Sequence, residues 1–104
     1  MEKVELLVLK SLIFNEQFHR KVLPFIKKEY FDDLSQKIIF EEICNFSVKY
    51  KKIATKEIVS IEVENRSDIT EDQYKQTIGV LNELEPVSIE FEWLVDTTEK
   101  WCRD

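Results

Sequence analysis

The sequence is poor in the residues that build tight turns and cofactor-binding loops. Its 104 residues include one glycine and two prolines. β-Sandwiches and barrels need many glycine- and proline-rich turns, so this composition argues against them. A single glycine also excludes a P-loop, a dinucleotide-binding fingerprint and a nucleophile elbow, since each motif needs at least two. The composition therefore indicates a small helical domain without the usual parts of an enzyme.

Cysteine and histidine are nearly as scarce. The chain has Cys44, Cys102 and a lone His19, and these form no CxxC pair and no Cys/His cluster. We therefore expect no metal site and no cofactor. Without a secretory leader pattern, two distant cysteines predict free thiols in a reducing, cytoplasmic setting. His19 lies beside two basic residues and has no nucleophile in any recognisable motif, so we expect a packing or surface histidine.

Long apolar runs are also absent. The longest, such as residues 6–9, are far too short to cross a bilayer, and we expect no membrane contact. Hydrophobic residues make up 43% and charged residues 35% of the chain, as in ordinary globular domains. Residues 1–104 are therefore predicted to form one domain.

Apolar residues recur at helical spacing along most of the chain. The pattern predicts helices over residues 2–14, from 16 to the region of Pro24, over 34–50, over 71–84, and from about Ser88 to the end. Thr55 is the expected cap of a further short helix, although the β-branched residues at 58–63 also suit a strand. Because the last pattern is still helical where the chain stops, we expect a piece of a longer protein.

Capping residues mark several helix starts. Asn15 and the Asp32-Asp33 pair precede two of the expected helices, and Thr70 with Gln73 forms a capping-box pattern. The predicted fold class is therefore all-α. We expect a compact helical head of about four helices at 1–68 and a C-terminal antiparallel helical hairpin at 69–104.

Charge is unevenly distributed between these two parts. The net charge of −6 arises entirely within residues 71–104, which hold nine acidic and three basic side chains, because residues 1–70 hold twelve of each. An acidic balance argues against non-specific binding to nucleic acid. We instead expect the hairpin to contact proteins, and pairing of two acidic hairpins to strengthen with salt.

The expected hairpin carries more apolar surface than two helices can bury between them. Tryptophan is enriched among interface anchors, which makes this surface a candidate self-association site. The alternative is that the rest of the domain covers it. The predicted protein-interface residues are Ile78, Leu81, Trp93, Leu94 and Trp101.

Two short basic clusters offer a weaker, nucleic-acid alternative. They consist of Lys27 with Lys28, and of Lys49, Lys51 and Lys52. The competing interpretation is a solvated helix end. Neighbouring carboxylates such as Glu41 and Glu42 are interpreted as capping or solvated-face residues, and we predict no catalytic residue.

Several blocks resemble the N-terminal domain of DnaB-type replicative helicases. They are the segment 8–15 (VLKSLIFN), the pair Tyr30-Phe31 and the segment 38–43 (IIFEEI). Further blocks resemble the T4-type phage branch of that family, among them 63–65 (VEN) and 93–101 (WLVDTTEKW). Lys10 and Asn15 stand where bacterial members usually have glycine and aspartate. These departures favour the phage branch.

The resemblance implies a role without a reaction. In that family a separate C-terminal motor domain holds the Walker motifs, while the N-terminal domain builds the collar of a hexameric ring and helps to dock primase. We therefore expect self-association, as a dimer or within a parent hexamer, and contacts with primase or other replisome proteins in the cytoplasm of a phage-infected cell. The alternative is a free-standing DNA-binding or replication accessory protein that uses the two lysine clusters.

Overall fold

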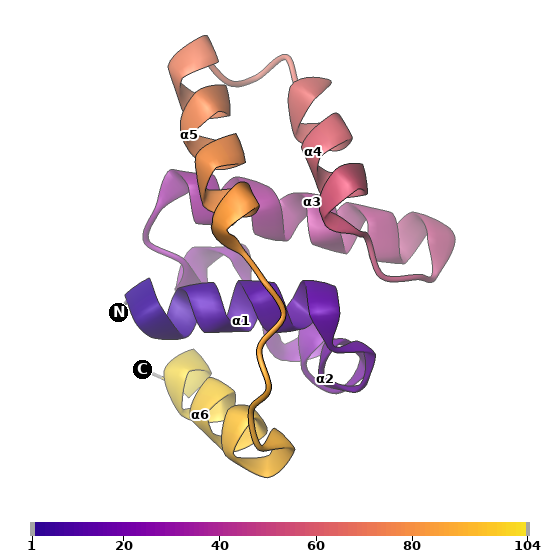
Figure 1. Ribbon diagram of the computed structural model, residues 1–104, viewed down its shortest axis with the longest axis vertical. Coiled ribbons are helices and arrows are strands. Elements are labelled where there is room, and N and C mark those ends of the chain that lie inside the picture. Colours follow the sequence, from indigo (N-terminus) through magenta and orange to yellow (C-terminus); the bar gives the residue numbers. More distant parts are fainter. Residues whose placement is uncertain (1, 104) are drawn as a thin grey trace.

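The longest helix, α3 (Leu34–Tyr50), lies at the centre of the packing in the computed structural model, which describes residues 2–103 (Figure 1). Helices α1 (Glu2–Phe14), α4 (Lys56–Glu64) and α5 (Glu71–Glu83) all pack against it. Its residues Ile39 and Ile43 are fully buried. The bounds of α3 are those predicted from the sequence. Its apolar side chains recur at helical spacing and pack against several neighbouring helices.

Local signals set the beginning and end of α3. The backbone N–H of Gln36 donates to the Asp33 side chain at 3.3 Å, so Asp33 is the N-cap. At the other end Lys51 has a φ of 59°, and its N–H donates to the Ser47 carbonyl at 2.9 Å. A left-handed residue stops the helix sharply and turns the chain away. Lys51 and Lys52 are thereby placed beside the helix end.

The short second helix, α2 (Glu16–Val22), follows α1 after one capping residue. The N–H of Phe18 donates to Asn15 Oδ1 at 3.0 Å, which confirms the predicted cap. The α-helix ends before Pro24, and two 3-10 turns follow at Leu23–Phe25 and Lys28–Tyr30. Proline lacks the backbone N–H that an α-helix needs at this point, so the end of the helix near Pro24 agrees with the prediction.

Side-chain caps open both α4 and α5, and residues 58–63 lie within helix α4 and not in a strand. The Ile58 N–H donates to Thr55 Oγ1 at 3.2 Å and opens a helix. At α5 the Gln73 N–H donates to Thr70 Oγ1 at 3.1 Å, and the Thr70 N–H donates to Gln73 Oε1 at 2.9 Å. Two donors at the start of α5 are thus satisfied by side chains, and the predicted capping box is confirmed.

The all-α class is confirmed, since the described residues form helices and no strand. The antiparallel hairpin expected at 69–104 is wrong. Helix α5 packs against α3 and α4, whereas α6 (Phe91–Arg103) packs against α1 and α2. Figure 1 places α5 and α6 toward opposite ends of the molecule.

The segment between α5 and α6 explains why the two helices separate. Residues 84–90 form no helix and run across α1 (Figure 1). Pro86, Val87 and Ile89 of this segment line one pocket together with Phe14 of α1. An extended segment of this length spans roughly 20 Å, enough to carry the chain past α1. Leu84 is buried at its start. The apolar face of α6 therefore finds its partners on the head.

Gly79 lies inside α5 in open space. A β-carbon added there would meet no atom within 4 Å, and no glycine has a positive φ in the described chain. We predict that Gly79→Ala raises the free energy of unfolding by about 0.5–1 kcal/mol, because alanine loses less backbone entropy in a helix. Urea denaturation followed by circular dichroism would measure the change. Gln76→Ala, at an exposed position of α5, is the control, and an equal gain from it would contradict the prediction.

Candidate protein-interaction site

The five predicted interface residues do not share one surface. Leu81 on α5 and Leu94 on α6 are buried in the core and closed to a partner, and Ile78 is partly buried. Trp101 is also partly buried, whereas the Trp93 side chain is 53% exposed. Of these five residues, Trp93 is the one available for an extensive contact with another molecule.

Trp101 anchors α6 to the head. Its ring centroid lies 5.0 Å from that of Phe31 and 5.9 Å from that of Tyr30, with edge-on interplanar angles of 63° and 80°. Such edge-to-face arrangements are favourable for aromatic rings. For this tryptophan the alternative from the sequence is confirmed, because the rest of the domain covers much of it.

Trp93 lies on the solvent face of α6. Its neighbours Glu92 and Asp96 are exposed, while Leu94 and Val95 turn inward. The backbone N–H of Trp93 donates to Glu90 Oε1 at 2.7 Å, so the Glu90 side chain satisfies a backbone donor in the first turn of the helix. An exposed indole therefore stands among carboxylates, on the face that an amphipathic helix usually gives to polar side chains.

The two lysine clusters remain apart. Lys28 Nζ donates to Glu41 Oε2 at 2.9 Å, and this bond raises the pKa of Lys28. Lys49 Nζ lies 5.3 Å from the centroid of the Tyr50 ring. Glu41 and Lys51 are ten residues apart on α3 and at its end, which separates the two clusters by about 15 Å along the helix axis. The five lysines thus form no continuous basic track.

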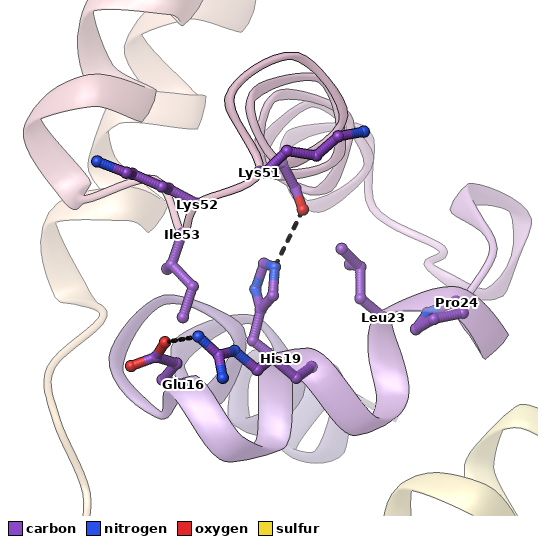
Figure 2. Close-up of a pocket in the computed structure, with 9 residues that line it drawn as sticks. Glu16, His19, Leu23, Pro24, Lys51, Lys52 and Ile53 are labelled. Carbon is purple, nitrogen blue, oxygen red and sulfur yellow. Dashed lines mark hydrogen bonds and ion pairs between the residues drawn. The ribbon is translucent and has the colours of Figure 1, made fainter.

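A cleft lies between α2 and the end of α3 (Figure 2), with a volume of about 650 Å³. Its apolar lining comes from Leu23, Pro24 and Ile53. Its polar lining comes from Glu16, His19, Arg20, Ser47, Lys51 and Lys52. Arg20 forms an ion pair with Glu16 (Figure 2), whereas neither Lys51 nor Lys52 pairs with a carboxylate of the described residues. The free positive charge of the cleft therefore comes from these two lysines.

His19 is a packing residue inside this cleft. Its Nδ1 donates to the Leu12 carbonyl at 3.0 Å, and its Nε2 lies 3.4 Å from Ser47 Oγ (Figure 2). A serine beside a histidine can be a nucleophile with its base. Here the serine lies in the last turn of α3, where the negative end of the helix dipole opposes a developing oxyanion. The pair joins α1, α2 and α3 instead, as the packing interpretation of His19 predicted.

The cysteines are free thiols, as predicted, and both are partly buried. Burial raises the pKa of Cys44 to about 11 and also raises the pKa of Cys102. A thiol in this state is a poor nucleophile.

Residues 2–103 hold no group of three or more His, Cys, Asp or Glu side chains placed to bind a metal ion. No helix within that range is long and apolar enough to cross a membrane.

Arg66 forms a charge cluster that the sequence interpretation missed. Its guanidinium donates to Glu42 Oε2 at 2.8 Å, to Glu41 Oε1 at 3.0 Å and to Asp68 Oδ2 at 2.9 Å. The interpretation of Glu41 and Glu42 as solvated-face residues is therefore wrong, since Glu42 is buried and both carboxylates are paired. The cluster fastens the loop between α4 and α5 to α3.

The hydrogen bonds and charges of this cluster shift the pKa values of Glu41, Asp68 and Arg66 so that each charged form is favoured. Burial alone would raise the pKa of Glu41, but the hydrogen bonds and charges of Lys28 and Arg66 outweigh it and lower the pKa. The hydrogen bond from Arg66 likewise lowers the pKa of Asp68. The pKa of Arg66 is raised, chiefly by its hydrogen bond to Asp68. Arg66, Glu41 and Asp68 are therefore ionised at neutral pH.

Comparison with known proteins finds a relative among phage helicases. The chain is 28% identical over 97 residues to a DnaB-like replicative helicase of Enterobacteria phage T4. The match covers 93% of this chain and 20% of the helicase, so the chain spans about a fifth of the relative's length. No family model matches the chain. The resemblance to DnaB-type replicative helicases is thereby confirmed.

Proposed function

We propose that this chain is the non-catalytic N-terminal domain of a phage replicative DNA helicase. The observation that carries the proposal is the similarity of nearly the whole chain to a fifth of the T4 helicase. The single glycine cannot supply a Walker motif within these 104 residues, which supports a parent whose motor lies in a different part of its chain. The domain would work in the cytoplasm of a phage-infected bacterium.

The role assigned to the domain is to support ring assembly and to contact primase or other replisome proteins. The described residues support this role because they hold surfaces suited to protein contact, chiefly the exposed Trp93 and the basic cleft. The thiols are not activated, and Ser47 lies at the negative end of the α3 dipole. A binding role accounts for these features without an enzymatic step.

A second candidate is a DNA-binding accessory protein. The unpaired Lys51 and Lys52 favour it, because free lysines can neutralise phosphates. The separation of these lysines from Lys27 and Lys28, together with the net charge of −6, leaves only a small patch for a nucleic acid. We therefore expect any contact between this domain and DNA to be weak.

The test is the size of the 104-residue chain in solution, measured by sedimentation velocity from about 1 μM to about 1 mM. We predict that the average mass rises with concentration above 12.5 kDa. The primase encoded in the same genome should co-sediment with the chain. A fluorescent single-stranded oligonucleotide is the control ligand. A monomer at every concentration that binds this oligonucleotide tightly and in a salt-dependent way would favour the second candidate instead.

A further inference from the structure

Two surfaces of this chain complement each other in charge, and each has an apolar part. From their chemistry we infer that the cleft beside α2 receives the acidic face around Trp93 from a second copy of the chain. The inference rests on the self-association proposed above and names the surfaces that make the contact. Its two halves are the acidic face, which consists of Glu92, Trp93 and Asp96, and the cleft.

The acidic face has an apolar centre. More than half of the Trp93 side chain is exposed on the first turns of α6, and carboxylates flank it one residue before and three residues after. A tryptophan is among the most effective anchors of protein interfaces when a pocket takes it out of water. Trp93 makes no aromatic contact among the described residues, in contrast to Trp101. The exposed part of its ring is therefore free to pack against another molecule.

The cleft carries charge of the opposite sign. Leu23, Pro24 and Ile53 give it an apolar lining, and Lys51 and Lys52 supply positive charge that no described carboxylate neutralises. Its volume of about 650 Å³ lies within the range of pockets that enclose small organic groups. An indole fits the apolar lining, and the lysines can then pair with the carboxylates beside that indole.

The occupant comes from another copy of the chain. Trp93 is not one of the residues that line the cleft of its own chain. A contact between two different surfaces leaves one free surface of each kind on a pair of molecules. Such contacts repeat head to tail and close into a ring or extend into a chain of molecules. This geometry suits a domain that supports ring assembly.

A nucleic acid is a poorer occupant of the cleft. Binding to phosphates needs several free cations along a track, and the cleft offers Lys51 and Lys52, with Arg20 already paired to Glu16. The surplus of negative charge on residues 71–104 repels a phosphate backbone as well. An acidic protein face with an apolar centre matches both the lysines and the apolar lining.

The test compares variants of the 104-residue chain by sedimentation velocity. Trp93→Ala should weaken self-association by about thirty-fold or more, as expected for a buried tryptophan anchor. Charge reversal of the cleft, Lys51→Glu with Lys52→Glu, should weaken it at least about ten-fold. Ile61→Ala, at an exposed position of α4, is the control for the first variant. Lys3→Glu with Lys75→Glu, which has the same net charge change, is the control for the second.

A charge swap gives the decisive result. Combining the reversed cleft with Glu92→Lys and Asp96→Lys in one chain should restore association, and added salt should weaken association of the wild-type chain. Circular dichroism confirms that each variant is folded. If the wild-type chain associates and the variants associate equally well, the contact inferred here is wrong while the proposed function stands. A wild-type chain that stays monomeric overturns self-association altogether. If the wild-type chain binds the oligonucleotide and the variant with Lys51→Glu and Lys52→Glu does not, the cleft is assigned to nucleic acid instead.

Discussion

Phe31→Ala is expected to lower the free energy of unfolding by about 3–5 kcal/mol, the usual cost of removing a buried aromatic ring. Phe31 is fully buried, and its ring lies 5.2 Å from that of Phe40 and 5.0 Å from that of Trp101. The substitution therefore opens a cavity between α3 and α6. Because small domains are stable by only about 5–15 kcal/mol, this loss would remove a large share of the total.

Urea denaturation followed by circular dichroism and by tryptophan fluorescence would measure the effect. The fluorescence of Trp101 should change in the folded variant, since its ring loses an edge-on partner. Phe25→Ala is the matched control, because Phe25 lies in the same connecting region but is 71% exposed. Its effect should stay within about 0.5 kcal/mol. Equal losses from the two substitutions would show that the ring of Phe31 carries no special packing.

The helices could be predicted because their signals are local. Asn15, Asp33 and Thr70 each accept a hydrogen bond from a backbone N–H three residues later, and such a contact depends only on neighbouring residues. The apolar spacing of 34–50 likewise repeats within the helix itself. Local patterns therefore predicted both the all-α class and most helix starts.

The packing partners of α5 and α6 could not be predicted, because they depend on contacts between residues that are distant in the sequence. The sequence shows that α5 and α6 are each amphipathic, but it does not say which partner covers each apolar face. Trp101 of α6 packs on Phe31 and Tyr30, which lie about seventy residues earlier in the chain. A short linker would have paired α5 with α6, whereas residues 84–90 reach across α1.

The candidate site was only partly visible in the sequence. The eight-residue separation sets Trp93 and Trp101 about 80° apart around one helix, and this spacing does not say which of the two the rest of the domain covers. The cleft joins α2 to residues 47–53 and has no sequence signature of its own. The left-handed Lys51 that brings the lysines to the cleft also has no signal, because glycine is the residue that usually marks this conformation.

Arg66→Met is expected to lower the free energy of unfolding by about 2–3 kcal/mol at pH 7. The substitution keeps an apolar stem in place of the aliphatic part of the arginine but leaves Glu42, which is buried, without its hydrogen-bond donor. The same change also removes the bond to Glu41 and releases the loop between α4 and α5. Arg20→Met is the matched control, since the pair of Arg20 with Glu16 is exposed and should contribute less than about 0.5 kcal/mol.

The pH dependence of this effect identifies its origin. Because the folded-state pKa values of Glu41 and Asp68 are lowered, their stabilisation is fully present above the unfolded-state pKa values, about 4, and is lost as the pH falls through the lower folded-state values. The difference in stability between the wild-type chain and Arg66→Met should therefore shrink between pH 5 and pH 2. Urea denaturation at pH 7, 5, 3 and 2 would measure it. A difference that is independent of pH would show that the ion pairs of Arg66 with Glu41 and Asp68 are not its origin.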